Sequence, residues 1–367
     1  MIGLLKRILL QGALLLLLVF TSACSSAAAA PTPNPAAEPS SIPSLVPSPQ
    51  GPTPTLPPAW AGQGYTGHLI LIASQQTGNQ VVEIDLVSGA TKTLFQAPQN
   101  SWLVAAAVSP DGQQILLTYA PPPSDGSAQL GYSDLYLLPA SGGEPQPFLT
   151  HKDPEEVYFD PAWSPDGKAI YYTHLYRLNT NSKVVAYQND IERTSLAGKV
   201  EKLIPHALRP VVSPDGTKLS YLNEDPATFG NDLYQANSDG SQLKPILPPG
   251  MEPPIDAHLY SKDGKSLFFS MVNPQTQPAR SWFDWVFGVD LASAHSVPSD
   301  WYRIPITGGG LVRMTNLNDI GLNAGLSPDG TQIAFIGSSG LYIMNLEGSN
   351  LFKLSNQLFV GTVNWIP

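Results

Sequence analysis

The chain has 367 residues and a formal net charge of −10, with 29 acidic and 19 basic residues. This acidic balance argues against nucleic acid or an anionic membrane surface as the main partner. A single cysteine excludes a disulfide framework or a thiolate metal site within the chain. The low charged fraction of 13%, with 31 glycines and 37 prolines, is typical of an all-β protein.

The N-terminus has the pattern of a bacterial export signal. Two basic residues precede an apolar stretch over residues 8–20, and small residues lead to Cys24. This order resembles a lipoprotein signal, which implies a signal peptide over 1–23, an acylated Cys24 and an extracytoplasmic protein anchored to the cell envelope by lipid. Thr21 departs from the pattern, because an aliphatic residue is usual there. An uncleaved membrane anchor is the alternative, although the apolar run is short for a spanning helix.

Residues 24–61 are rich in Ala, Pro, Ser and Thr. Eleven prolines fall between Pro31 and Pro58, and charges are almost lacking. Such a segment cannot form a hydrophobic core, so we expect a lipidated Cys followed by a disordered tether.

The tetrapeptide Ser-Pro-Asp-Gly recurs through the rest of the chain. In this order Pro presets φ, Asp bonds its own backbone and Gly accepts a positive φ, which predicts a tight turn between antiparallel strands. Each copy stands between two short apolar runs. A turn repeated in this way indicates a β-propeller. The four copies and one near copy begin at Ser109, Ser164, Ser213, Ser327 and Ser261.

A second kind of hairpin, with a small Gly-containing turn, appears six times, at Gly89, Gly143, Gly198, Gly240, Gly309 and Gly348. Six outer hairpins against five inner turns suggest that one blade is assembled from both ends of the chain. The phrase around Trp365 resembles the inner strand that ends at Trp163, whereas the strand near Leu69 has no inner strand before it. We therefore predict a six-bladed propeller over 62–367, closed by pairing the C-terminal strand with the first blade.

The blades differ in length, and the extra residues lie mostly between the second and third strands. These insertions occupy 121–132, 175–188 and 273–298. In a propeller these loops emerge on the face that also carries the connections between blades. We expect the three insertions to share that face, where function is concentrated.

Three phrases resemble the WD40-like PD40 repeats of TolB-like propellers. They are PAWSPDGKAIYY (161–172), VVSPDGTKLSYL (211–222) and GLSPDGTQIAFIGSSGLYIMNLEGSNLFKLS (325–355). The resemblance covers most of 62–367 and implies a six-bladed propeller, in agreement with the turn count. TolB itself is a periplasmic part of the Tol–Pal envelope system, so a Tol-like envelope scaffold is one functional expectation.

Two groups of residues are candidates for ligand binding. Polar residues that enter the inner strands are expected near the channel, where they either line a water-filled space, as is normal in propellers, or bind a small polar or cationic ligand. These are Asp160, Arg209, Asp256, His258 and Asn323. The largest insertion carries an aromatic cluster, Trp282, Phe283, Trp285 and Phe287. This cluster either packs on the propeller or forms a stacking or protein-contact surface.

No catalytic motif stands out: the chain lacks a Gly-x-Ser-x-Gly elbow and a His-Glu-x-x-His helix. The histidines stand at different distances from their turns, which speaks against a ring of metal ligands. We therefore expect no cofactor, no metal and no catalytic residue. The favoured function is a monomeric, membrane-tethered module that binds a protein, peptide or glycan. The alternatives are a lyase or hydrolase that acts on polysaccharide at the channel mouth, or a Tol-like envelope scaffold.

Overall fold

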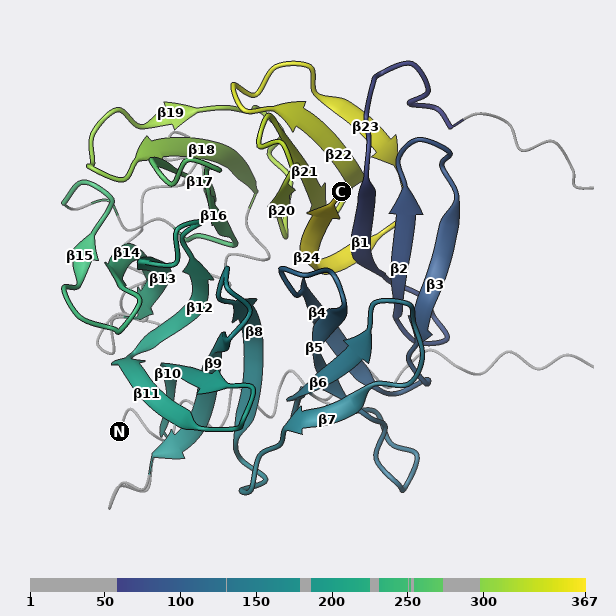
Figure 1. The fold of residues 1–367 in the computed structure, drawn as a ribbon, viewed down its shortest axis with the longest axis vertical. Helices are drawn as coiled ribbons and strands as arrows, with labels where there is room; N and C mark the ends of the chain where they lie inside the picture. The colour runs from purple at the N-terminus through teal and green to yellow at the C-terminus, as the bar shows by residue number, and fades with distance from the viewer. Residues whose placement is uncertain are drawn as a thin grey trace, which may run out of the picture. The chain divides into compact units, whose positions relative to one another are not determined.

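The computed structural model describes residues 58–129, 131–178, 186–224, 231–249, 251, 254–272 and 298–367. All regular secondary structure in these residues is β-strand, arranged as six antiparallel sheets of four strands. The sheets stand around a common centre like the blades of a propeller (Figure 1). The predicted fold class and blade count are confirmed. No apolar helix of membrane-spanning length occurs in the described residues.

Blade 1 joins the last strand of the chain to the first three, and blades 2 to 6 follow in chain order. The strands of blades 1 to 3 are β1 (His68–Ala73), β2 (Gln80–Asp85), β3 (Thr91–Gln96) and β24 (Phe359–Ile366); β4 (Trp102–Val108), β5 (Gln114–Ala120), β6 (Asp134–Pro139) and β7 (Gln146–Leu149); β8 (Val157–Trp163), β9 (Ala169–Leu178), β10 (Ala186–Ser195) and β11 (Val200–Pro205). The strands of blades 4 to 6 are β12 (Ala207–Val212), β13 (Lys218–Glu224), β14 (Asn231–Asn237) and β15 (Lys244–Pro245); β16 (His258–Tyr260), β17 (Ser266–Val272), β18 (Ser299–Pro305) and β19 (Val312–Arg313); β20 (Asn323–Leu326), β21 (Gln332–Gly337), β22 (Gly340–Asn345) and β23 (Phe352–Ser355).

The Ser-Pro-Asp-Gly turns link the first and second strands of blades 2 to 6, as predicted. In blade 3, Ser164 Oγ donates to Asp166 Oδ1 at 2.6 Å and accepts the backbone N–H of Ala169 at 2.9 Å. Gly167 takes a φ of +70°, which an L side chain rarely adopts. The aspartate of the repeat is therefore part of the turn itself, which explains why the tetrapeptide recurs.

The hydrophobic core is divided among the six interfaces between neighbouring blades. Each of six apolar clusters joins residues of two adjacent sheets. In β1, for example, Leu69 and Leu71 pack toward blade 6, whereas Ile70 and Ile72 pack toward blade 2. Because both faces of each sheet are covered, the strands that follow the turns, such as β5, β17 and β21, are nearly continuous apolar runs.

Pairing between β24 and β1 closes the ring, as predicted. Leu69 lies opposite Trp365 in this ladder, and Trp365 Nε1 donates to the Thr66 carbonyl at 2.9 Å. β24 also contacts blade 2 through its polar side chains. Asn364 Nδ2 donates to the Ala106 carbonyl at 2.9 Å, and Thr362 Oγ1 accepts the Ala106 N–H at 2.9 Å. The last strand thus bridges the first and second blades.

The structure corrects one expectation about the insertions. Part of the segment 175–188 is not a loop, because β9 continues to Leu178 and pairs there with Ala186 of β10. The other expected insertion that is described, 121–132 without residue 130, does connect β5 and β6. Residues 273–297, which hold most of the third insertion, lie outside the described residues.

Gly361 lets β24 approach β4 closely, and its replacement tests the closure. A Cβ at Gly361 would lie 1.8 Å from the Val104 carbonyl oxygen, and the residue has a φ of +72°. We expect Gly361→Ala to lower the free energy of unfolding by more than the ~1–2 kcal/mol that positive φ alone costs an L residue. Urea titration measures this loss.

Gly112→Ala is the matched control for this prediction. Gly112 has a similar φ of +69°, but nothing lies within 4 Å of the place that a Cβ would take there. Equal destabilisation by the two substitutions would show that the contact between β24 and β4 is not tight.

Candidate functional site

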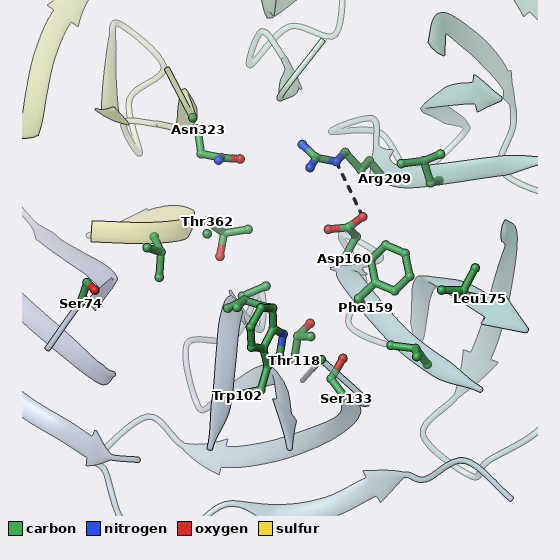
Figure 2. Close-up of a pocket in the computed structure, with 18 of the residues that line it drawn as sticks. Ser74, Trp102, Thr118, Ser133, Phe159, Asp160, Leu175, Arg209, Asn323 and Thr362 are labelled. Atoms are coloured by element: carbon green, nitrogen blue, oxygen red, sulfur yellow. Dashed lines mark ion pairs between the residues drawn. The ribbon is translucent and has the colours of Figure 1, made fainter. Parts of the chain in front are cut away.

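A cavity of about 870 Å³ opens at the centre of the propeller, on the face that carries the connections between blades. This volume lies within the range of small-molecule and peptide side-chain pockets. Its walls come from the inner strands of blades 1, 2, 3, 4 and 6, together with adjoining loops, and no residue of β16 lines it. Figure 2 shows the side chains that converge on it from these blades.

Aromatic side chains gather at this cavity. Trp102, Tyr132 and Tyr187 line it and are 39%, 47% and 52% exposed. In the part of the chain that the structure describes, these are the three most exposed aromatic residues. The concentration of these three exposed rings at one cavity marks the cavity as a contact surface.

Two charged residues of neighbouring blades meet in the cavity wall. Asp160 lies in β8 and Arg209 in β12, and Arg209 Nε is 3.9 Å from Asp160 Oδ2 (Figure 2). Both residues have positive φ, +49° and +55°, at places where the ladders to β9 and β13 shift register. Such bulges re-aim side chains, and here they point both groups into the cavity. The Arg209 N–H donates to Thr173 Oγ1 at 3.0 Å and so links blade 4 to blade 3.

The surroundings of Asp160 disfavour its charged form. Burial raises the pKa of Asp160, while the Arg209 charge and a hydrogen bond from Thr173 act in the opposite direction. Asp160 Oδ2 accepts no hydrogen bond within the described residues. Thr118, which is fully buried in the cavity wall, likewise has a hydroxyl without a hydrogen-bond partner among the described residues.

The structure brings together three of the predicted polar residues at the cavity and leaves two others out of its lining. Asp160, Arg209 and Asn323 line the cavity, and Asn323 lies across it from the other two (Figure 2). Asp256 and His258 are buried in blade 5 and do not line it. The positive charge of Arg209 nevertheless acts on both residues and lowers the pKa of each.

The remaining predicted site residues lie outside the described residues. These are Cys24 and the aromatic cluster Trp282, Phe283, Trp285 and Phe287. Among the described residues, no group of three or more His, Cys, Asp or Glu side chains is arranged to hold a metal ion.

Sequence reasoning missed the cavity residues Trp102, Thr118, Tyr132 and Tyr187. A signal was present for three of them. Tyr132 and Tyr187 fall within the segments recognised as insertions, and Trp102 stands at the start of an inner strand. Nothing in the sequence distinguishes Thr118, because its role depends on which neighbouring groups its hydroxyl fails to reach.

Comparison with known proteins gives likeness in fold. No protein-family model matches the chain, and no curated protein matches it in sequence. Among solved structures, TolB from Acinetobacter baumannii superposes with a TM-score of 0.57 at 17% identity, over 82% of this chain and 67% of that chain. A putative TolB from Agrobacterium tumefaciens gives 0.54 at 17% identity, over 83% of this chain and 100% of that chain.

The fold is that of the TolB-like propellers. A chain of a nidogen/laminin complex shares it with a TM-score of 0.53 at 13% identity, over 81% of this chain and 97% of that one. An oligogalacturonate lyase in complex with manganese has a TM-score of 0.50 at 13% identity, over 76% and 71%. At these identities the likeness describes the TolB-like scaffold and leaves the site to its own residues.

Asp256 and His258 should give the stability of this propeller two opposing pH dependences. Burial raises the pKa of Asp256 to about 6, and it lowers the pKa of His258 to about 4. The Asp256 contribution is therefore largest at low pH and is lost as the pH rises from its unfolded value of 3.8 to about 6. The His258 contribution is present above pH 6.5 and is lost as the pH falls to about 4.

Single substitutions should uncover each dependence. Each shift corresponds to about 3 kcal/mol at ~1.36 kcal/mol per pKa unit. Between pH 6.5 and 4, Asp256→Asn should lose stability more steeply on acidification than the wild type, and His258→Gln should lose it less steeply. Urea titrations across this range measure both slopes, and parallel curves for the two variants would contradict the assignment.

Proposed function

We propose that this TolB-like propeller is a membrane-tethered, extracytoplasmic binding module. Its ligand is a protein, peptide or glycan that enters the central cavity. The observation that carries the proposal is the convergence of Trp102, Tyr132 and Tyr187 on this cavity. Aromatic side chains supply large contact areas at binding hot spots, and they stack on sugars and peptides alike.

A rigid frame holds the proposed binding surface. Trp102 begins the inner strand β4, whose backbone is bonded to Thr362 and Asn364 of β24. Tyr187 stands in β10, opposite Arg177 in the ladder to β9. Because the rings stand on or beside paired strands, binding costs less ordering than it would on long loops. The similar fold within a nidogen/laminin complex supports a protein partner.

The N-terminal sequence supports the tether. A signal peptide over 1–23, an acylated Cys24 and a proline-rich segment to residue 61 would hold the propeller at a membrane outside the cytoplasm. The TolB-like fold is in keeping with an envelope location, and a Tol-like scaffold is one form that the binding module could take.

Removal of the Trp102 side chain should weaken binding. We expect Trp102→Ala to lower the affinity for ligands selected from a displayed peptide library or a glycan array by about tenfold or more, because central aromatic residues dominate interfaces. Fluorescence polarisation with the selected ligands measures the change. Val312→Ala, which truncates an exposed side chain on the outer strand β19, is the control and should leave binding unchanged. Ligands that bind both variants equally well would refute the cavity as the binding site.

Replacement of Cys24 should abolish the anchor. We expect Cys24→Ala to lose incorporation of a labelled fatty acid and to leave the membrane fraction, because no other cysteine is present to be acylated. Ser25→Ala serves as the control and should behave as the wild type. Fatty-acid label retained by Cys24→Ala would contradict lipidation at this residue.

A polysaccharide-acting enzyme is the second candidate, and the half-buried Asp160 favours it. A carboxyl group with a raised pKa beside an arginine has the composition of a general acid or base site. The lyase of similar fold acts on oligogalacturonate according to its name. Formation of unsaturated products from oligogalacturonate by the wild type, and its loss in Asp160→Asn, would favour this candidate over the binding module.

A further inference from the structure

We propose that the cavity binds a lysine side chain of a partner peptide, with the ammonium group held by Asp160 and Thr118. This inference deepens the binding function proposed above and rests on it. It names the chemistry that the cavity recognises, which is an ammonium group at the end of an alkyl chain.

The first step is the carboxylate. Asp160 is 27% exposed and lines the cavity, where one of its oxygens faces Arg209 and the other faces the open space (Figure 2). The distance of 3.9 Å from Arg209 Nε exceeds that of a hydrogen bond. Oδ2, which faces Arg209, is buried, so the other oxygen of Asp160 is the one that a ligand in the cavity would reach. A charged donor would make the stronger bond with it.

The second step is the hydroxyl of Thr118. This side chain is fully buried, and its Oγ1 has no hydrogen-bond partner among the described residues. Thr173, nine residues after its turn serine as Thr118 is, uses its own Oγ1 to accept the Arg209 N–H. A buried hydroxyl without a partner costs free energy that a bound donor would recover. An ammonium has three donors and can satisfy the carboxylate and the hydroxyl together.

The third step is the apolar wall. Val104, Val157 and Leu175 also line the cavity, and Phe159 stands directly beside Asp160 (Figure 2). Such walls suit the four-carbon stem of a lysine, which buries its methylenes while its charge reaches a polar partner. The rings of Phe159 and Trp102 add a favourable environment for a cation. A sugar, whose hydroxyls surround its ring, would leave these aliphatic walls against polar groups.

The fourth step is the charge balance. Arg209 acts electrostatically on two carboxyl groups, Asp160 and Asp256, so its single positive charge is shared between them. At the rim, Glu155 is already engaged by Arg177 at 2.8 Å. Among the charged side chains that line the cavity, Glu155 and Asp160 are acidic and Arg209 is basic, and the whole chain has a formal charge of −10. A cationic group complements this field, whereas an anionic group would oppose it.

Selection from an unbiased library tests the inference. The full-length protein in detergent is used to select binders from displayed random peptides, and the enriched sequences are then measured individually. We expect lysine to be enriched, and replacement of that lysine by norleucine, which keeps the stem and removes the charge, to weaken binding by about tenfold or more. Asp160→Asn should weaken binding of the lysine peptide to the same extent and should leave binding of the norleucine peptide unchanged.

The controls separate this inference from the proposed function. Asp125→Asn removes a charge from an exposed turn between β5 and β6, away from the cavity lining, and should not change the affinity. Peptides that need Trp102 but contain no enriched lysine, or that tolerate norleucine, would overturn the lysine assignment and leave the binding module standing. Peptides that bind without regard to Trp102 would overturn both. Binding of glucosamine oligosaccharides that depends on Asp160, with no binding of lysine peptides, would also overturn the assignment. The norleucine comparison uses only the wild type, so it holds even if a variant fails to fold.

Discussion

The pairing of β24 with β1 is the interaction on which the rest of the propeller depends. Each blade covers both of its faces with its neighbours, so a blade at the end of an open row would leave an apolar face exposed. The ladder that sets Trp365 opposite Leu69 makes that row continuous. The polar side chains of Thr362 and Asn364 then bind the same strand to the inner strand of blade 2, so that closure also positions the cavity wall.

The cavity follows from local departures from regular strand geometry. In a regular strand, successive side chains point to opposite faces of the sheet. At Asp160 and Arg209 a shifted register and a positive φ interrupt this alternation and turn both side chains toward the centre. The strand β24 is drawn close to β4 at Gly361. The open space at the centre is lined by residues of five blades, and Asp160, Phe159 and Trp102 are among them.

The architecture could be predicted from the sequence because its signals are local and repeated. The Ser-Pro-Asp-Gly turns mark the inner hairpins, and the likeness of the segments ending at Trp163 and Trp365 identifies the closing strand. The site was less accessible to such reasoning. Asp160, Arg209 and Asn323 were expected near the channel and line the cavity, but the same rule selected Asp256 and His258, which are buried in blade 5. Spacing gives the height of a residue along its strand; the side to which it points depends on bulges that no residue type specifies. The hydroxyl of Thr118 has no hydrogen-bond partner among the residues that the structure describes. This property depends on distances between blades, so no sequence pattern predicts it.

The closing strand has a consequence for the order of assembly. The hydrogen bond from Trp365 to Thr66 joins residues 299 positions apart, so blade 1 cannot be completed until the chain has been made as far as β24. During that interval β1 presents an unpaired edge, which can pair with the strands of other chains. A chain that stops shortly before residue 359 would retain every repeat of the turn and yet would keep that edge permanently. Synthesis of β24 therefore decides when the edge of β1 can be covered within its own molecule.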